Sequence, residues 1–92
     1  MNLNAAWTVR LARDAAKQLE SLPTDRQHRV RKALREMAAQ PLRGDVIALK
    51  GKQWKGRYRK RVGQYRIIFT LDHSRNEIEV SAILIRSEKT YG

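Results

Sequence analysis

The strongest chemical signal in the sequence is a run of cationic side chains that extends from Lys50 to Arg66. Eight of these seventeen residues are lysine or arginine, and none is acidic. The cations are Lys50, Lys52, Lys55, Arg57, Arg59, Lys60, Arg61 and Arg66. Trp54, Tyr58 and Tyr65 are interleaved with them. Because guanidinium groups bind phosphate, this segment predicts binding to a nucleic acid, whereas Trp7 and Trp54 are more often packing residues than platforms for a base.

Side-chain alternation within this run places three arginines on one face of a sheet. In the predicted strand Tyr58–Val62, Arg59 and Arg61 point to the same side. The apolar positions of Tyr65–Phe69 are expected to face the helices, which leaves Arg66 on the side of the other two arginines. Gathering three like charges would not stabilise a fold, so we expect an anionic ligand there. The alternative is a solvated basic hairpin that steers nucleic acid nonspecifically.

The other cations of the run are predicted to contact the nucleic-acid backbone outside the arginine cluster. Lys50, Lys52, Lys55 and Arg57 would form a solvated surface over which the nucleic acid approaches. Lys60 has the parity of the core positions, so we expect its side chain to extend from the sheet edge towards solvent.

A second group of candidates lies near the C-terminus. Arg86 follows the last predicted strand and could reach the face that carries the arginine cluster. Tyr91 could stack on a base, although the residues alone favour a near-terminal tyrosine with no such role. Glu88 could orient Arg86 or be an ordinary surface glutamate.

Hydrophobic periodicity predicts the elements that position these residues. They are a strand at 7–11, helices at 12–22 and 25–40, an extended segment at 46–50, and strands at 58–62, 65–72 and 77–85. Pro23 ends the first helix, and Thr24 with Gln27 forms a capping-box pattern for the second. Gly63 and Gln64 predict a two-residue hairpin turn, and residues 73–76 a second turn.

This succession of elements predicts one domain over residues 1–92, with an α+β fold in the order β-α-α-β-β-β. We expect a small antiparallel sheet with the N-terminal helical hairpin packed on one face. The other face of the sheet would stay open and could hold a concave site.

Composition restricts the class of function further. The net charge of +11 and the pI of about 10.9 are typical of proteins that bind nucleic acids. There is no cysteine, and His28 and His73 lie far apart, so we expect no metal site and no cofactor. The sequence contains neither a signal peptide nor an apolar run of about 20 residues, which predicts a cytoplasmic protein without membrane contact.

Several segments together resemble the RelE/ParE superfamily of bacterial toxins from type II toxin–antitoxin pairs. They are Leu49–Gly51, Tyr58–Phe69, Ile85–Tyr91 and the phrase Lys17–Pro23. The resemblance covers nearly the whole chain and implies a small sheet with an N-terminal helical hairpin. The basic residues at 59 and 61, the arginines at 66 and 86 and the nearby tyrosine favour the RelE type over the ParE type.

Resemblance to the RelE branch implies a metal-independent endoribonuclease that cleaves mRNA in the ribosomal A site and inhibits translation. The catalytic residues that it implies are Arg59, Arg61, Arg66, Arg86 and Tyr91. The RNA-binding residues would be Lys50, Lys52, Lys55, Arg57 and Lys60. Arg61 and Arg66 would clamp the phosphate, and Arg86 would stabilise or protonate the leaving oxygen. Tyr91 would stack on a base or orient the 2′-hydroxyl.

The sequence departs from the RelE pattern in ways that concern the proton acceptor. Positions 59 and 61 carry arginine where well-studied RelE-type toxins carry lysine, and Ile85 stands where many relatives have histidine. Arginine stays protonated in proteins and cannot easily accept a proton. Lys60, Glu88, or positioning combined with groups of the ribosome remain as alternatives.

Two other classes of function remain open. One is a noncatalytic protein, either a ParE-like inhibitor of DNA gyrase or an inactive relative that acts only with its antitoxin. The other is a nontoxic basic protein that binds RNA or the ribosome. The expected partners are a cognate antitoxin, mRNA and ribosomal RNA, with operator DNA contacted only through the antitoxin complex.

Overall fold

A computed structural model describes residues 6–85 of the chain. Its elements are β1 (Thr8–Leu11), α1 (Arg13–Glu20), α2 (Thr24–Ala39), β2 (Val46–Ala48), the 3₁₀ turn η1 (Lys52–Trp54), β3 (Arg57–Val62), β4 (Tyr65–Asp72) and β5 (Glu77–Ile85). The bounds of β4 and β5 agree with the predicted ones, and the others differ by a few residues at their ends. Arg86, Glu88 and Tyr91 lie outside the described residues.

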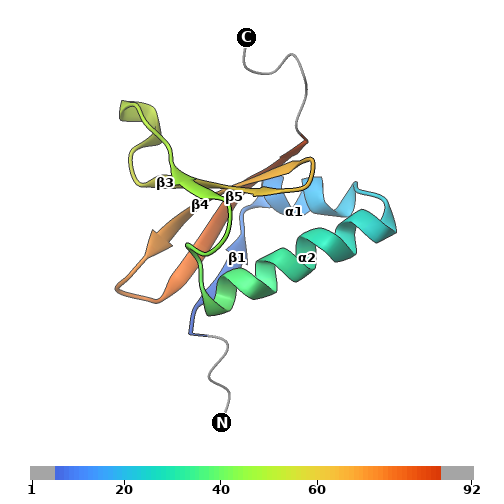
Figure 1. Cartoon of the computed structure of the whole chain (residues 1–92), viewed down its shortest axis with the longest axis horizontal. Helices are drawn as coiled ribbons and strands as arrows, with labels where there is room; N and C mark the ends of the chain where they lie inside the picture. Colours follow the sequence, from blue (N-terminus) through green and yellow to red (C-terminus); the bar gives the residue numbers. More distant parts are fainter. Residues whose placement is uncertain (1–5, 86–92) are drawn as a thin grey trace.

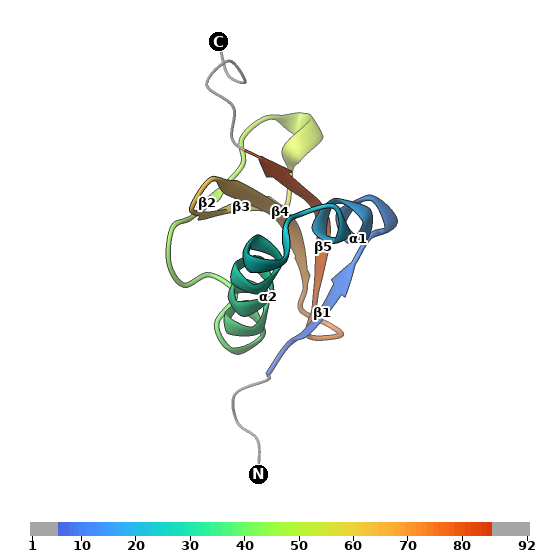
Figure 2. The ribbon, with the colours of Figure 1, turned by 90° about the vertical axis from the view of Figure 1, so that its right-hand side faces the viewer.

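Two helices pack against one face of a five-stranded sheet, as Figures 1 and 2 show. This confirms the α+β class and the helical hairpin on one side. The strand order is β1-β5-β4-β3-β2, and β1 runs parallel to β5 while the other neighbours are antiparallel. The predicted antiparallel sheet with the order β-α-α-β-β-β was therefore wrong in two respects: β2 is a strand of its own, and the sheet is mixed.

The physical reason for both differences is pairing between distant segments. Thr8 pairs with Glu77, so β1 finds its partner only at the end of the chain, and the long connection allows the two strands to run parallel. β2 is three residues long, and its pairing of Val46 with Lys60 and of Ala48 with Tyr58 makes it a strand. Neither pairing has a local sequence signal.

The start of α2 also differs from the prediction. Thr24 is the first helical residue, Pro23 occupies the cap position, and no side chain caps the helix there. Gln27 instead directs its side-chain Nε2 backwards, where it donates to the carbonyl oxygens of Leu22 at 2.8 Å and Glu20 at 3.1 Å. The amide thus ties α2 to the end of α1, because those carbonyls have no helical partner.

The hydrophobic core lies between the helices and the sheet. Its largest fully buried side chains are Tyr65, Phe69, Leu19, Met37, Ile67, Ile78, Val30 and Val80. The alternate residues 65, 67 and 69 of β4 all belong to this core, as predicted from strand parity. Val62 pairs with Tyr65, so Gly63 and Gln64 form the predicted two-residue turn between β3 and β4.

A side-chain network closes the turn between β4 and β5. The Asp72 Oδ1 accepts hydrogen bonds from the Ser74 hydroxyl at 2.7 Å, the Ser74 amide at 3.1 Å and the Arg75 amide at 3.2 Å. The Ser74 hydroxyl, followed by the two amides, lowers the pKa of Asp72 below its ordinary value of 3.8. The carboxylate thereby holds together the hairpin that carries the centre of the sheet.

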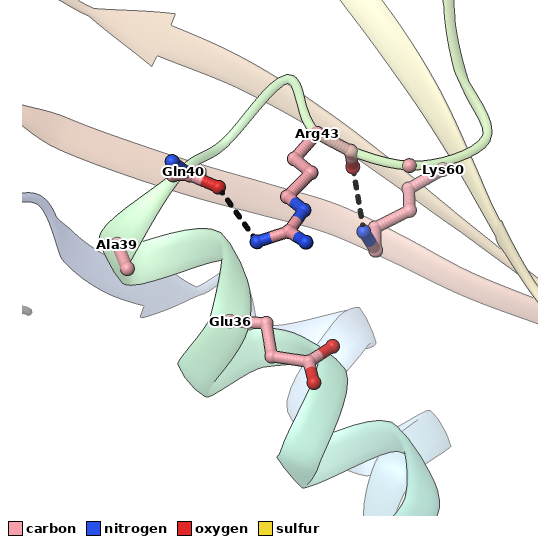
Figure 3. A pocket seen from close by; sticks show the side chains of 6 residues that line it. Glu36, Ala39, Gln40, Arg43 and Lys60 are labelled. Atoms are coloured by element: carbon pink, nitrogen blue, oxygen red, sulfur yellow. Dashed lines mark hydrogen bonds between the residues drawn. The ribbon is translucent and has the colours of Figure 1, made fainter.

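Lys60 anchors the loop between α2 and β2. Its side chain lies on the helix side of the sheet, where the Nζ donates to the Arg43 carbonyl oxygen at 2.9 Å (Figure 3). The residue is 8% exposed and lines a pocket of about 340 Å³ with Glu36, Gln40 and Arg43 among others. The predicted role of Lys60 in RNA binding was based on a side chain that extends to solvent, and the structure directs its ammonium group into this loop instead.

The Asp72 network predicts a pH-dependent loss of stability. Because the pKa of Asp72 is lowered in the folded state, its contribution is complete above the ordinary pKa of 3.8 and is lost as pH falls through the lower folded value. Asp72→Ala should therefore lower the urea midpoint at pH 7, and the gap to wild type should close well below pH 3.8. A gap of the same size in acid would contradict this, and Ser74→Ala serves as the matched control that weakens only the network.

Because the Lys60 ammonium group binds the Arg43 carbonyl, replacing Lys60 should lower stability and leave RNA binding unchanged. Lys60→Met keeps the length of the side chain but leaves the Arg43 carbonyl without its donor, so the free energy of unfolding should fall by about 1–3 kcal/mol. Urea unfolding and RNA binding are measured on Lys60→Met and on Lys50→Met as the control. If Lys60→Met weakens RNA binding as much as Lys50→Met does, its ammonium group contacts the nucleic acid after all.

Candidate functional site

The face of the sheet away from the helices carries a pocket of about 370 Å³. It is lined by Ile47, Leu49, Lys50, Trp54, Arg59, Arg61, Arg66, Ile68 and Leu84. The floor comes from the strands, and one wall comes from the β2–β3 connection with η1, which stands clear of the sheet at the upper left of Figure 1. Four elements of the sheet and one loop therefore converge on the same space.

Strand register brings the three predicted arginines together in this pocket. Arg61 is the direct cross-strand partner of Arg66, and Arg59 lies two residues along the same strand, opposite Ile68. Side chains directly opposite each other in an antiparallel pair have Cβ atoms about 5 Å apart. The prediction that Arg59, Arg61 and Arg66 share the open face is confirmed.

Asp45 supplies a carboxylate that the sequence reasoning overlooked. Its Oδ1 lies 3.7 Å from Arg59 Nη2, and its Oδ2 lies 3.7 Å from Arg61 Nε. The main chain holds it there, because the Arg61 amide donates to the Asp45 carbonyl oxygen at 2.9 Å. No role was assigned to Asp45 from the sequence. Asp45 alternates with Ile47 and Leu49, so strand parity could have placed it on the same face of the sheet. That argument needs the pairing of this segment with β3, which the sequence does not show.

Arg59 is the most deeply placed of the three cations. The residue is 9% exposed, and its Nη1 is buried without a hydrogen-bond partner among residues 6–85. Burying a guanidinium donor without an acceptor costs free energy, so the fold keeps this group for some purpose other than stability.

The pocket is amphipathic, since both apolar side chains and arginines line it. Ile47, Trp54 and Leu84 are exposed large hydrophobic residues, whereas Ile68 between the arginines is nearly buried. Of the three aromatic residues interleaved with the cations, Trp54 alone lines this pocket. Tyr58 stacks on Phe69 with ring centroids 5.5 Å apart, and Tyr65 is buried in the core.

The other predicted RNA-binding residues have different positions. Lys50 lines the pocket, whereas Lys52 and Lys55 are exposed in and just after η1, outside the lining. Arg57 is half-buried at the start of β3 and is also outside the lining. The predicted catalytic residues Arg86 and Tyr91 lie beyond residue 85, where the description ends.

None of the helices within residues 6–85 is long and apolar enough to cross a membrane.

Comparison with known proteins identifies the family. The chain matches the family described as the ParE toxin of type II toxin–antitoxin systems, parDE, over residues 9–90. A comparison with curated proteins gives no match. Among solved structures, the chain is similar to one chain of the archaeal RelE–RelB complex from Pyrococcus horikoshii OT3, with 25% identity and a TM-score of 0.77 over 90% of this chain and 98% of that chain.

Two further structures resemble the chain to a comparable extent. The toxin–antitoxin complex RelBE2 from Mycobacterium tuberculosis has 25% identity and a TM-score of 0.77, over 87% of this chain and 98% of that chain. The isolated RelE toxin of E. coli, at 16% identity, shares the fold with a TM-score of 0.72 over 91% of this chain and 88% of that chain. The family match over residues 9–90 and these structures confirm the resemblance: the chain belongs to the ParE toxin family of type II toxin–antitoxin systems, within the RelE/ParE superfamily.

Proposed function

We propose that this toxin is a metal-independent, ribosome-dependent endoribonuclease that cleaves mRNA and thereby inhibits translation. The observation that carries the proposal is the convergence of Arg59, Arg61 and Arg66 on one pocket of the open sheet face. The similarity to structures of RelE toxins also supports the endoribonuclease proposal. In this proposal the pocket holds the phosphate that is cut.

The arginine cluster suits the charge that develops during RNA cleavage. The 2′-oxygen attacks the adjacent phosphorus, the bond from phosphorus to the 5′-oxygen breaks, and the pentacoordinate transition state carries extra negative charge. Arg61 and Arg66, as cross-strand partners, can donate to two phosphate oxygens, and Arg59, which also lines the pocket, adds a third positive charge. Arg86 and Tyr91 keep the roles that the family resemblance implies, at the leaving oxygen and at a neighbouring base.

Asp45 is the group that we assign to accept the proton of the 2′-hydroxyl. Lys60, the earlier candidate, directs its Nζ to the Arg43 carbonyl on the helix side of the sheet. Asp45 contacts two arginines of the cluster and is half exposed, so its carboxylate is within reach of a ligand bound to them. A phosphate bound by the same two guanidinium groups would therefore lie beside this carboxylate.

The surrounding cations would position the ribosome and the mRNA. Lys50 at the pocket, with Lys52, Lys55 and Arg57 close by in the sequence, can neutralise phosphates of the RNA backbone without selecting a base. Binding of this kind should weaken steeply with added salt, because each neutralised phosphate releases counterions.

A second candidate function is inhibition of DNA gyrase without catalysis. It is favoured by one observation, the match of residues 9–90 to the ParE toxin family. The two candidates differ in their effect on cells that express the protein. An endoribonuclease stops protein synthesis and leaves cut mRNA, whereas a gyrase poison induces DNA damage and filamentation.

The partner expected to neutralise this toxin is a cognate antitoxin. Relatives were crystallised in toxin–antitoxin complexes, among them RelE–RelB, RelBE2 and YoeB–YefM. With a net charge of +11, this chain would attract an acidic partner segment, which could cover the arginine pocket or the helices. Contact with operator DNA would then occur only through the antitoxin.

Truncation of the phosphate clamp tests the endoribonuclease proposal. Arg61→Ala and Arg66→Ala should each lower the rate of mRNA cleavage by about 10²–10³-fold, as removal of one charge-stabilising donor does in other enzymes. Cleavage is measured by primer extension on ribosome-bound mRNA, and circular dichroism checks the fold. Arg13→Ala, at an exposed position of α1, is the matched control. Wild-type cleavage by both pocket variants would show that the site is elsewhere.

Replacement of the carboxylate tests the role of Asp45. Asp45→Asn keeps an oxygen for the guanidinium groups but removes the basic group, so the single-turnover cleavage rate should fall by about 10²–10⁴-fold while mRNA on the ribosome is bound as before. Asp45→Glu should restore part of the rate. A variant that loses affinity and rate together would assign Asp45 to positioning the arginines, and unchanged cleavage would remove it from the mechanism.

A further inference from the structure

The β2–β3 connection presents an indole ring beside the arginine pocket. Trp54 is the last residue of η1, and its amide donates to the Gly51 carbonyl oxygen at 3.1 Å. The flanking Gly51 and Gly56 have φ angles of +104° and +80°, in a region that side chains other than glycine rarely adopt. The Trp54 Cδ1 lies 3.6 Å from where a Cβ of residue 51 would be, so the ring packs over the glycine. The backbone of this loop therefore determines where the ring lies.

Trp54 differs from the other tryptophan of the chain in its surroundings. Trp7 packs against the hydrophobic core and meets His73 edge-on, with ring centroids 5.3 Å apart. Trp54 is 38% exposed and lies on the opposite side of the sheet from the core, together with the exposed side chains of Ile47 and Leu84. Leaving so large an apolar ring partly in water forgoes the free energy that its burial would contribute.

The pocket offers two kinds of surface within one volume. Arg59, Arg61 and Arg66 provide guanidinium groups, and Trp54 with Ile47, Leu49 and Leu84 provides apolar side chains. The volume of about 370 Å³ is within the range of sites for small ligands. A nucleotide has the matching arrangement, because its phosphate is anionic and its base has flat, weakly polar faces.

We propose that Trp54 is the base platform of this pocket: a nucleobase stacks on its indole while the phosphate of the same nucleotide is held by the arginines. The indole thus gives the site a preference for a complete nucleotide over a bare phosphate or a sugar phosphate. The inference rests on the proposed function for its use in mRNA cleavage, but the binding itself is independent of catalysis. An apolar side chain of a protein partner is the competing occupant of the same wall.

The two tryptophans allow a direct test by fluorescence. In the full-length Trp7→Phe variant, Trp54 is the remaining tryptophan of the chain. Nucleoside 5′-monophosphates should change its emission in a saturable manner, and ribose 5-phosphate and inorganic phosphate should not. Because stacking of one base contributes about 1–3 kcal/mol, the nucleotides should bind roughly 5- to 100-fold more tightly than ribose 5-phosphate.

Variants of the platform complete the test by calorimetry on the otherwise wild-type chain. Trp54→Ala should weaken nucleotide binding by the same roughly 5- to 100-fold and leave ribose 5-phosphate binding unchanged. Trp54→Phe should retain most of the nucleotide affinity, since a phenyl ring still stacks. Leu42→Ala, at another exposed apolar position that does not line the pocket, is the matched control and should bind nucleotides as wild type does.

Several results would overturn the inference. They are equal affinities for nucleotide and ribose 5-phosphate, absence of nucleotide binding to Trp7→Phe, or equal losses for both ligands in Trp54→Ala. The apolar side chains of the pocket would then be assigned to contact with a protein partner. The outcome for the proposed function is separate: nucleotide binding without mRNA cleavage overturns the endoribonuclease and keeps the platform. If the protein cleaves mRNA but Trp54→Ala binds nucleotides as wild type does, the role of Trp54 is overturned and the endoribonuclease proposal stands.

Discussion

The pairing of Arg61 with Arg66 across the β3–β4 hairpin is the constraint on which the rest of the site depends. A two-residue turn sets this register, and the register places two guanidinium groups side by side on a sheet face. Arg59 adds a third charge and buries most of its side chain. Such a cluster repels itself, so neighbouring parts of the fold have to supply compensation.

The compensation comes from the segment that precedes β2. Asp45 places one carboxylate between Arg59 and Arg61, and the short strand β2 keeps it there by pairing with β3. The same segment is held from the other side of the sheet by the Lys60 ammonium group, which binds the Arg43 carbonyl. Adjacent residues of β3 thus have different roles: positions 59 and 61 line the pocket, and position 60 holds the loop that supplies their counterion.

Both mRNA cleavage and gyrase inhibition are candidate functions of this toxin, and they make different demands on the pocket. Cleavage requires groups that stabilise charge and move a proton, whereas inhibition without catalysis does not. Positions 59 and 61 carry arginine, a side chain that can bind a phosphate through two N–H groups but cannot easily exchange a proton. The Asp45 carboxylate, in contact with these arginines, is the proton acceptor that we propose instead. In the proposed mechanism, the cations of the pocket would stabilise charge, the Asp45 carboxylate beside it would accept the proton, and the Trp54 ring would hold the nucleobase.

Sequence alone determined the features that depend on local periodicity. It predicted the bounds of β4 and β5, the turn at Gly63 and Gln64, the helical hairpin and the shared face of Arg59, Arg61 and Arg66. Each of these follows from alternation or helical spacing within about a dozen residues, which the chain displays directly. The three arginines of the candidate site could therefore be identified from the sequence before their tertiary contacts were known.

Only the tertiary structure decided which distant segments meet. The parallel pairing of β1 with β5, the pairing of β2 with β3, the contact of Asp45 with two arginines and the inward direction of Lys60 all join residues 10 or more positions apart. Their register is set by hydrogen bonds and packing between whole elements, and a one-residue slip would reverse every side chain. The arginine cluster was therefore visible in the sequence, but its counterion and its aromatic wall became visible only in the fold.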